Sequence, residues 1–434
     1  MKAFNSLSRS TIKKISCQKG EPYWMLDFRL KALEKFYELE VPRYGANLSD
    51  LDFEKIDYYV NPGATKKRTW KEVPKEIKDT YDKLGIPEAE KNFLAGVEAQ
   101  FDSEAIYGSL KRQIEEKGVI FTNIEIGLKE HEDLFKKYFG SLVKVEDNKF
   151  SALNSAFWSG GSFLYVPKGV KVDLPLQAYF QMGTPRLGQF ERTLIIADEG
   201  SSVHYMEGCT APMYSQNALH AGVVEVFVEK GASVRYTTVQ NWSKDVYNLV
   251  TKKSLVKEAG KMYWVDGNLG SKVTMKYPAC YLEGARSHGE MLSVGVCGQG
   301  QEIFAGARMI HKGVGTTSKV ISKTLVNPGG KSVFQGDLKI DVGALGARAH
   351  IQCDSIIREE PAITDSLPFL EVREPSAVVT HEASATKLEE ENLAYLKGRG
   401  LEEQEALNLI IKGFLEEVIR ELPIEYALEF NKLL

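Results

Sequence analysis

The sequence contains few cysteines and no long hydrophobic run, and each shortage excludes classes of protein. The five cysteines form an odd, scattered set: Cys17, Cys209, Cys280, Cys297 and Cys353. No C-x-x-C pair occurs, so we expect reduced thiols rather than a disulfide framework or a four-cysteine zinc site. Apolar runs such as Leu194 to Ala197 are far shorter than the ~20 residues that cross a bilayer. Because residues 1–20 also lack the apolar stretch of a secretion signal, a cytoplasmic protein without a membrane span is expected.

An excess of charge of one sign is missing as well. The 55 basic and 59 acidic side chains are mixed along the chain and leave a formal net charge of −4. Because binding to a phosphate backbone requires a broad cationic surface, nucleic acid is not an expected partner. A phosphate-binding loop is also absent, since its nearest approach, Gly330-Lys-Ser, has Leu325 where the first glycine belongs. Any ATP hydrolysis must therefore come from a partner.

The hydrophobic pattern divides the chain into regions 1–150, 151–380 and 381–434. The first is predicted to be mainly helical, with helices over Glu21–Leu39, Lys75–Leu84, Ser103–Lys117 and His131–Tyr138. The second consists of short β-rich runs broken by glycine: Ser162–Val166, Thr193–Ala197, Val223–Val228, Ser233–Val239, Lys261–Val265 and Asp337–Val342. The third returns to helix, with an apolar face from Leu407 to Leu422 and a second short helix over Ile424–Leu433.

Three turns of the second region resemble one another: Asp198-Glu-Gly-Ser-Ser-Val, Glu229-Lys-Gly-Ala-Ser-Val and Lys257-Glu-Ala-Gly-Lys-Met, which carry Gly200, Gly231 and Gly260. Their spacing is a loose repeat of about thirty residues, which favours the stacked coils of a β-solenoid. An ordinary β-sandwich with similar turns is about equally compatible with this period.

Longer strings carry a resemblance to a known family: Gly96-Val-Glu-Ala-Gln-Phe-Asp-Ser-Glu, Ala156-Phe-Trp-Ser-Gly-Gly-Ser-Phe, Gly188-Gln-Phe-Glu-Arg-Thr-Leu-Ile-Ile-Ala-Asp-Glu-Gly, Glu207-Gly-Cys-Thr-Ala-Pro, Val239-Gln-Asn-Trp, Asn248-Leu-Val-Thr-Lys, Gln352-Cys-Asp-Ser and His381-Glu-Ala. From about Ile15 to Leu434 the chain resembles the SufB/SufD family of the SUF iron–sulfur cluster assembly system. The strings around Cys209 and Cys353 are most similar to the scaffold branch, SufB.

The resemblance implies a mainly β fold, a right-handed parallel β-helix core flanked by N-terminal and C-terminal helical regions. It implies a non-enzymatic scaffold for assembly and transfer of a transient iron–sulfur cluster. The implied partners are a SufC-type ABC ATPase on the C-terminal helices, where we single out Ile411 and Phe414, a SufD-like paralogue or a second copy of this chain, and a cysteine desulfurase with its sulfur shuttle. Reduced flavin is allowed as a cofactor of the complex.

Site residues are carried over from the same resemblance. Cys353 is expected to bind the cluster near the interface with the partner subunit, and His381 and Glu382 match the family's ligand region. Thr380 stands where some relatives have another acidic ligand. For a lone cysteine the alternative is a small buried hydrophobic residue. Iron–sulfur clusters prefer thiolates, sometimes joined by histidine or carboxylate, and a cluster held by few thiolates is easier to release.

Cys209 is expected to receive sulfur as a persulfide, since the thiolate is the nucleophile in such a transfer. By the same resemblance, Gln240, Trp242 and Lys252 line a passage through the solenoid towards Cys353. Alternatively, they are polar residues that line the core. The other cysteines, Cys17, Cys280 and Cys297, are interpreted as structural.

Two alternatives to the scaffold function stay open. A SufD-like subunit of the same complex would support its partners without binding a cluster. A carbohydrate-active enzyme is the rival of another class, because β-helix folds often carry polysaccharide lyases. The absence of a secretion signal counts against that enzyme.

Overall fold

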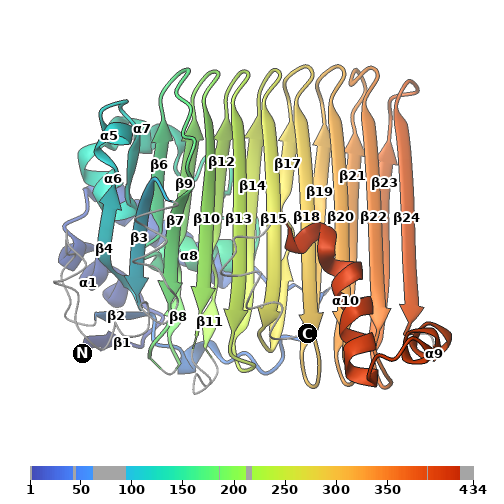
Figure 1. The fold of residues 1–434 in the computed structure, drawn as a ribbon. Helices are drawn as coiled ribbons and strands as arrows, with labels where there is room; N and C mark the ends of the chain where they lie inside the picture. Colours follow the sequence, from blue (N-terminus) through green and yellow to red (C-terminus); the bar gives the residue numbers. More distant parts are fainter. Residues whose placement is uncertain are drawn as a thin grey trace.

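The computed structural model describes residues 2–42, 45–61, 94–184, 186–211, 218–388 and 390–420. The helices expected over Lys75–Leu84 and Ile424–Leu433 lie outside these residues. The core is a β-solenoid of about eight turns with helices at both ends, which confirms the predicted mainly β solenoid (Figure 1). Within the described ranges, no helix is both long and apolar enough to cross a membrane.

Two sheets face each other across the solenoid. The front sheet contains, in spatial order, β4 (Glu104–Leu110), β3 (Gly96–Phe101), β7 (Leu176–Gln181), β10 (Ser202–Thr210), β13 (Ser233–Trp242), β15 (Lys261–Gly270), β18 (His288–Cys297), β20 (Thr317–Val326), β22 (Arg348–Ile357) and β24 (Val378–Lys387). The back sheet contains β5 (Ile120–Asn123), β6 (Ser162–Val166), β9 (Arg192–Ala197), β12 (Val223–Val228), β14 (Tyr247–Val256), β16 (Val273–Lys276), β19 (Glu302–His311), β21 (Lys331–Ile340) and β23 (Ile363–Val372), with β8 (Gly188–Gln189), β11 (Leu219–His220) and β17 (Ala279–Leu282) beside them. From β7 and β9 onwards, neighbouring strands in both sheets pair in parallel.

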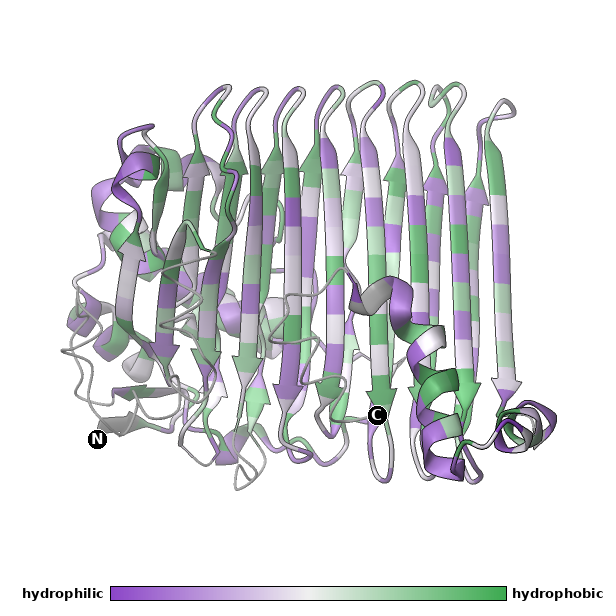
Figure 2. Cartoon of the chain, viewed as in Figure 1, coloured by the Kyte–Doolittle hydropathy of each residue, from purple (hydrophilic) through white to green (hydrophobic). Residues whose placement is uncertain are grey.

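The repeated turns hold consecutive coils in register. Gly200 and Gly231 both have φ +65°, a left-handed conformation that glycine adopts without steric cost. The Gly200 N–H donates to Lys230 O over 2.8 Å, which ties one turn to the next. In the third turn Ala259, rather than Gly260, takes the left-handed conformation, with φ 53°. The turns therefore repeat as the sequence predicted. Hydrophobic and hydrophilic residues alternate along many of the strands (Figure 2), as expected where successive side chains point to opposite faces of a sheet.

The described helices are α1 (Arg9–Lys19), α2 (Tyr23–Glu38), α5 (Arg112–Glu115), α6 (Ile124–Glu130), α7 (Glu132–Tyr138), α8 (Lys149–Phe157), α9 (Glu390–Gly398) and α10 (Glu403–Ile419). Short strands β1 (Lys2–Phe4) and β2 (Tyr59–Asn61) and the 3-10 turn η1 (Phe53–Lys55) accompany them. The predicted helices Glu21–Leu39 and His131–Tyr138 are confirmed by α2 and α7. The helix predicted over Ser103–Lys117 is wrong: β4 occupies most of it and pairs antiparallel with β3. The strand predicted over Asp337–Val342 is displaced, since β21 ends at Ile340.

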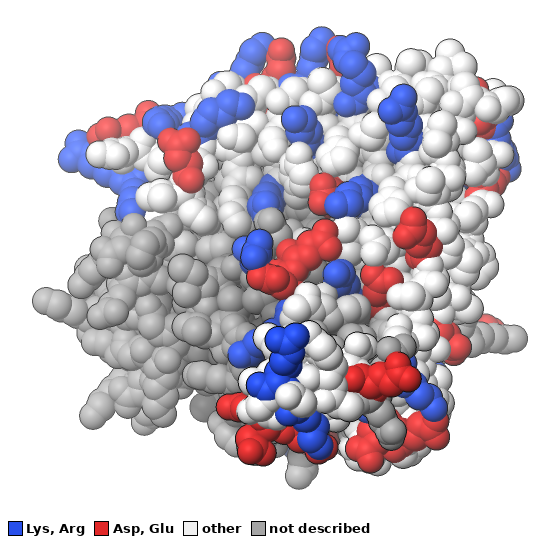
Figure 3. Space-filling model, turned by 45° about the vertical axis from the view of Figure 1, so that its right-hand side comes forward, with Lys and Arg blue, Asp and Glu red and all other residues white. Residues whose placement is uncertain are grey.

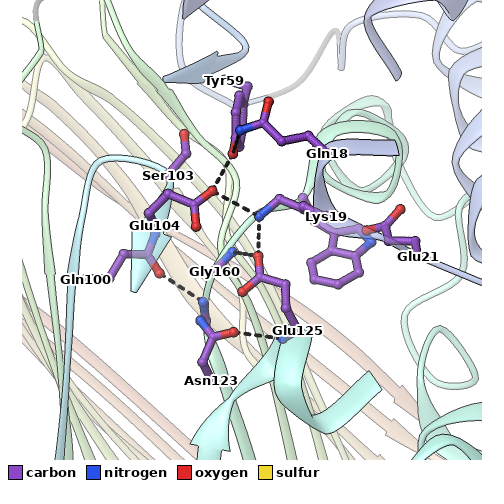
Figure 4. Close-up of polar contacts among 12 residues, drawn as sticks. Gln18, Lys19, Glu21, Tyr59, Gln100, Ser103, Glu104, Asn123, Glu125 and Gly160 are labelled. Atoms are coloured by element: carbon purple, nitrogen blue, oxygen red, sulfur yellow. Dashed lines mark hydrogen bonds and ion pairs between the residues drawn. The ribbon is translucent and has the colours of Figure 1, made fainter. Parts of the chain in front are cut away.

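Ion pairs attach the N-terminal helices to the solenoid (Figure 4). Lys19, at the end of α1, has its Nζ 2.5 Å from Glu125 Oε1 on α6 and 3.4 Å from Glu104 Oε1 on β4. The hydroxyl of Tyr59 donates to Glu104, and the Gly160 N–H donates to Glu125 Oε1 over 2.8 Å. These charges satisfy one another at the N-terminal end of the solenoid, which explains why Lys19 is almost fully buried.

Candidate functional site

Inward-facing residues of the front sheet, most of them polar, form two rows along the solenoid. Because each row follows the parallel register, its members are direct neighbours on successive strands. One row contains Cys209, Gln240, Asn268, Gly295, Thr324 and Ser355, and the other contains Glu207, Thr238, Asp266, Ser293, Ser322 and Cys353. All twelve residues are buried. The five strand-to-strand steps between β10 and β22 span about 24 Å at ~4.8 Å a step, so these inner rows connect the turn of Cys209 with the turn of Cys353.

Cys209 lies fully buried beside an acidic side chain. Its Sγ–H donates towards Glu207 Oε1 over 3.7 Å, and the Tyr236 hydroxyl donates to Glu207 Oε2 over 2.6 Å. Burial, together with the negative charge of Glu207, raises the pKa of Cys209 well above its ordinary value, and burial also raises the pKa of Glu207. The thiol is therefore protonated in this conformation, next to a carboxylate that can accept its proton.

Two buried lysines that act on Cys209 share one carboxylate. Lys252 Nζ lies 3.1 Å from Asp266 Oδ1, and Lys276 Nζ lies 3.3 Å from Asp266 Oδ2. Burial lowers the pKa of Lys276 to about 8, although Asp266 opposes this shift, and both lysines lower the pKa of Cys209. With two cations against one carboxylate, this lysine pair can stabilise an anion inside the solenoid.

Lys276 and Asp266 were not predicted as site residues. The only signal in the sequence was a charged residue within each of two β-rich segments, and charged residues are seldom fully buried without partners. A single such residue says nothing about the residue opposite it. Only the stacking of the turns brings Lys276 on β16 to Asp266 on β15.

The lysine pair predicts a pH dependence of stability. Folded Lys276 loses its proton near pH 8, whereas an unfolded lysine holds it to about pH 10.4. Between these values the unfolded state binds more protons, so stability rises with pH. Urea unfolding gives the free energies of unfolding of wild type and of Lys276→Met. The value for wild type minus the value for the variant should increase by up to about 1.4 kcal/mol per pH unit in this window. Lys253→Met, a half-buried lysine on β14, is the control; the same rise for both variants would contradict the assignment.

Gln240 and Trp242 lie in the same interior. Gln240 is the strand neighbour of Cys209, and its Oε1 accepts from Asn248 Nδ2 over 2.6 Å. The Trp242 ring lies 4.7 Å from the ring of His220. Among the described residues, Gln240 Nε2 and Trp242 Nε1 have no hydrogen-bond partner although both are buried. The structure thus brings Gln240, Trp242 and Lys252 around Cys209, and it leaves donors free for a guest with acceptor atoms.

Cys353 lies near the opposite end of the solenoid, on β22. It is 3% exposed, and burial raises its pKa to about 12 despite a contact with the Ser366 hydroxyl. His381 on β24 also faces inward, two residues before the strand neighbour of Cys353, and its Nε2 has no hydrogen-bond partner in the described chain. Glu382 points to the other face and is exposed. Across the described ranges, no group of three or more His, Cys, Asp or Glu side chains could hold a metal ion, so Cys353, His381 and Glu382 do not form a complete ligand set.

The last turn of the solenoid presents open strands and apolar side chains. Strands β23 and β24 end the two sheets in the described structure, with Ile363, Leu367, Phe369, Leu370, Val372 and Val378 exposed. Figure 3 brings this end forward, and a broad part of its surface lacks charged side chains. Unpaired edge strands with exposed apolar residues are ready to pair with another chain.

Helix α10 lies across the outer face of the front sheet (Figure 1). Ile411 is 1% exposed and, with Leu415, packs in one cluster with Leu292 and Ile321. Phe414 is half-buried, with Lys323 Nζ 5.3 Å from its ring centre. The apolar face of α10 is therefore covered largely by the chain's own sheet.

Comparison with known proteins identifies relatives along nearly the whole sequence. Residues 180–414 match the sequence model of a family described as SUF system FeS cluster assembly, SufBD core domain, and residues 4–178 match that of the SufBD protein N-terminal region. The chain is 53% identical over 428 residues to iron–sulfur cluster assembly SufBD family proteins of Staphylococcus aureus and Staphylococcus saprophyticus. These alignments cover 99% of this chain and 92% of each relative.

Proposed function

Because this chain belongs to the SufBD family of iron–sulfur cluster assembly proteins, we propose that it is the SufB-type scaffold on which a cluster is assembled and from which it is transferred. The observation that carries the proposal is the pair of buried rows that run side by side from the turn of Cys209 to the turn of Cys353, with one of the two thiols in each row. A subunit that only supports its partners has no need of two thiols at the ends of a buried polar track. The chain itself is proposed to be no enzyme, and its location is proposed to be the cytoplasm.

Sulfur enters at Cys209. Glu207 takes the thiol proton, and the thiolate attacks the outer sulfur of a donor persulfide, whose S–S bond breaks as the donor thiolate leaves. Lys252 and Lys276 stabilise the resulting anionic persulfide. Release of sulfide from Cys209 towards Cys353 consumes two electrons, which reduced flavin in the complex supplies.

The cluster, as cargo, is held at the last turn. Cys353 and His381 supply ligands from this chain, and the missing ligands come from a SufD-like paralogue or a second copy that pairs with β23 and β24. Glu382 joins them only if that strand rearranges, because it faces away from Cys353. Incomplete ligation by one chain suits a cluster that must be passed on.

A SufC-type ATPase is the proposed partner of the C-terminal helices, and a cysteine desulfurase with its shuttle supplies sulfur. Since Ile411 packs on the chain's own sheet, a charge introduced there would disturb that packing. Tyr395 and Leu409 are 61% and 54% exposed and leave a face of α9 and α10 open to the ATPase. Movement of these helices would be transmitted to the neighbouring end of the solenoid.

The test is anaerobic reconstitution of the chain with ferrous iron, cysteine, a cysteine desulfurase and the ATPase, followed by visible absorption and iron analysis. Wild type should assemble a cluster and transfer it to an apo-ferredoxin, whereas Cys353→Ser should lose most of the bound iron. Cys280→Ser is the matched control, because Cys280 is another buried thiol beside a serine, Ser254. Equal assembly by wild type and Cys353→Ser would refute the ligand assignment, and no assembly by wild type would favour the SufD-like alternative.

A further inference from the structure

A groove of about 750 Å³ opens at the carboxyl ends of β10, β13, β15 and β18, beside the turn of Cys209. Its lining includes Thr210, Ala211, Asn241, Trp242, Val296 and Cys297. Figure 1 shows that these strands end along one edge of the front sheet. The groove therefore extends along several coils of the solenoid.

The groove lies close to Cys209, because its lining begins one residue further along the chain. Ala211, on its rim, is the next inward position after Cys209, which places the two Cα atoms about 7 Å apart along the strand. Trp242 occupies the same position after Gln240 on the adjacent strand and belongs to the same core cluster as Cys209. Cys209 itself is 0% exposed, so a reagent in the groove reaches the thiol only if the residues that cover it move.

Two polar atoms of the lining are buried without a partner in the described structure. Trp242 Nε1 is a donor without an acceptor, and Asn327 Oδ1 is an acceptor without a donor. A peptide unit supplies both an acceptor and a donor, as its C=O and N–H. The lining also includes the apolar side chains of Leu269 and Val296 and one charge of each sign, Lys244 and Asp245. A neutral lining with one free donor and one free acceptor suits peptide backbone better than a free sulfide ion.

We propose that this groove binds an extended segment of the sulfur-donor protein and presents its cysteine persulfide to Cys209. The proposal rests on the proposed function, since it requires Cys209 to accept sulfur. Binding moves the side chains that cover Cys209 aside, the Cys209 thiolate bonds to the outer sulfur, and the donor S–S bond breaks to leave a donor thiolate. The proton passes to Glu207, and no electrons are gained or lost overall.

The test obstructs the groove without touching Cys209. Asn241→Trp and Val296→Trp each place an indole on the groove wall from an outward-facing strand position, on β13 and β18 respectively. Lys261→Trp is the matched control, because it adds the same indole at an exposed outward position at the far end of β15. Sulfur transfer is measured anaerobically, as the amount of persulfide on Cys209 by mass spectrometry, from a purified persulfide-loaded cysteine desulfurase or from free cysteine persulfide.

Both groove variants should slow transfer from the protein donor by about tenfold or more, whereas Lys261→Trp should match wild type. Free cysteine persulfide should still react with every variant, because it is small enough to pass the added indole; this reaction also shows that the variants are folded. Unchanged transfer from the protein donor in both groove variants would overturn the groove proposal, as would equal loss with both donors. If wild type gains no sulfur on Cys209 from either donor, the proposed function fails instead.

Discussion

Replacement of Glu207 by glutamine should slow persulfide formation on Cys209 by about 100-fold, the usual contribution of a positioned general base. Glutamine keeps the size of the side chain and can still accept hydrogen bonds from Tyr236, but it cannot take a proton. Burial raises the pKa of Cys209 well above its ordinary value. Loss of the Glu207 charge removes part of that rise, but the buried thiol stays protonated and no longer has a neighbouring acceptor for its proton. Glu207 lies nearest to that proton, with its Oε1 3.7 Å from Sγ.

The measurement is the rate of Cys209 persulfide formation from free cysteine persulfide between pH 6 and 9. In wild type, the rate should fall as the pH decreases through the raised pKa of Glu207, because the protonated acid no longer accepts the thiol proton. Glu207→Gln should lack this fall. Glu191→Gln is the control, since Glu191 is also buried but is paired with His220 rather than with the thiol. Equal slowing of both variants would show a general electrostatic effect and refute the assignment of Glu207 as the base.

Replacement of Arg192 by methionine should lower the free energy of unfolding by about 3–5 kcal/mol, the usual cost of breaking a buried ion pair on one side. Arg192 and Glu225 are both fully buried, and Arg192 Nη2 lies 3.0 Å from Glu225 Oε2. The same carboxylate accepts backbone N–H groups of Gly140, Leu142 and Val143. The pair therefore joins β9 and β12 to the chain after α7, and its loss leaves an uncompensated buried charge.

Urea unfolding measures this effect, and a double-mutant cycle with Glu225→Gln separates the pair from the two side chains. The double variant should be more stable than the sum of the single losses implies, because it contains no unpaired buried charge. Arg112→Met should change little, since Arg112 pairs with Glu116 at the surface, where the side chains are 88% and 61% exposed. Additive losses in the cycle would show that Arg192 acts through packing alone, for instance against the Phe139 ring 4.3 Å away.

Several strands of the solenoid could be predicted from the sequence, whereas the choice of a solenoid over a β-sandwich rested on the family resemblance. Strands such as Ser162–Val166 and Val223–Val228 coincide with β6 and β12, because β-branched runs between glycine turns have few other stable conformations. The strand within Ser103–Lys117 could not be predicted, since the mixture of polar and apolar residues in this segment also satisfies a helical spacing. Its strand β4 forms only because β3 offers an edge to pair with, and that partner is set by tertiary structure.

The candidate site, too, could be predicted only in part from the sequence. The sequence by itself determined that the chain has five scattered thiols and a glycine-marked repeat, and that it lacks a phosphate-binding loop. Its motifs indicated Cys209 and Cys353 as the site cysteines. Only the tertiary structure decided which residues meet them. Successive side chains of a strand point to opposite faces, so the register of the coils turns Glu207, Asp266 and Lys276 towards the buried interior and leaves Glu382 on the outer face.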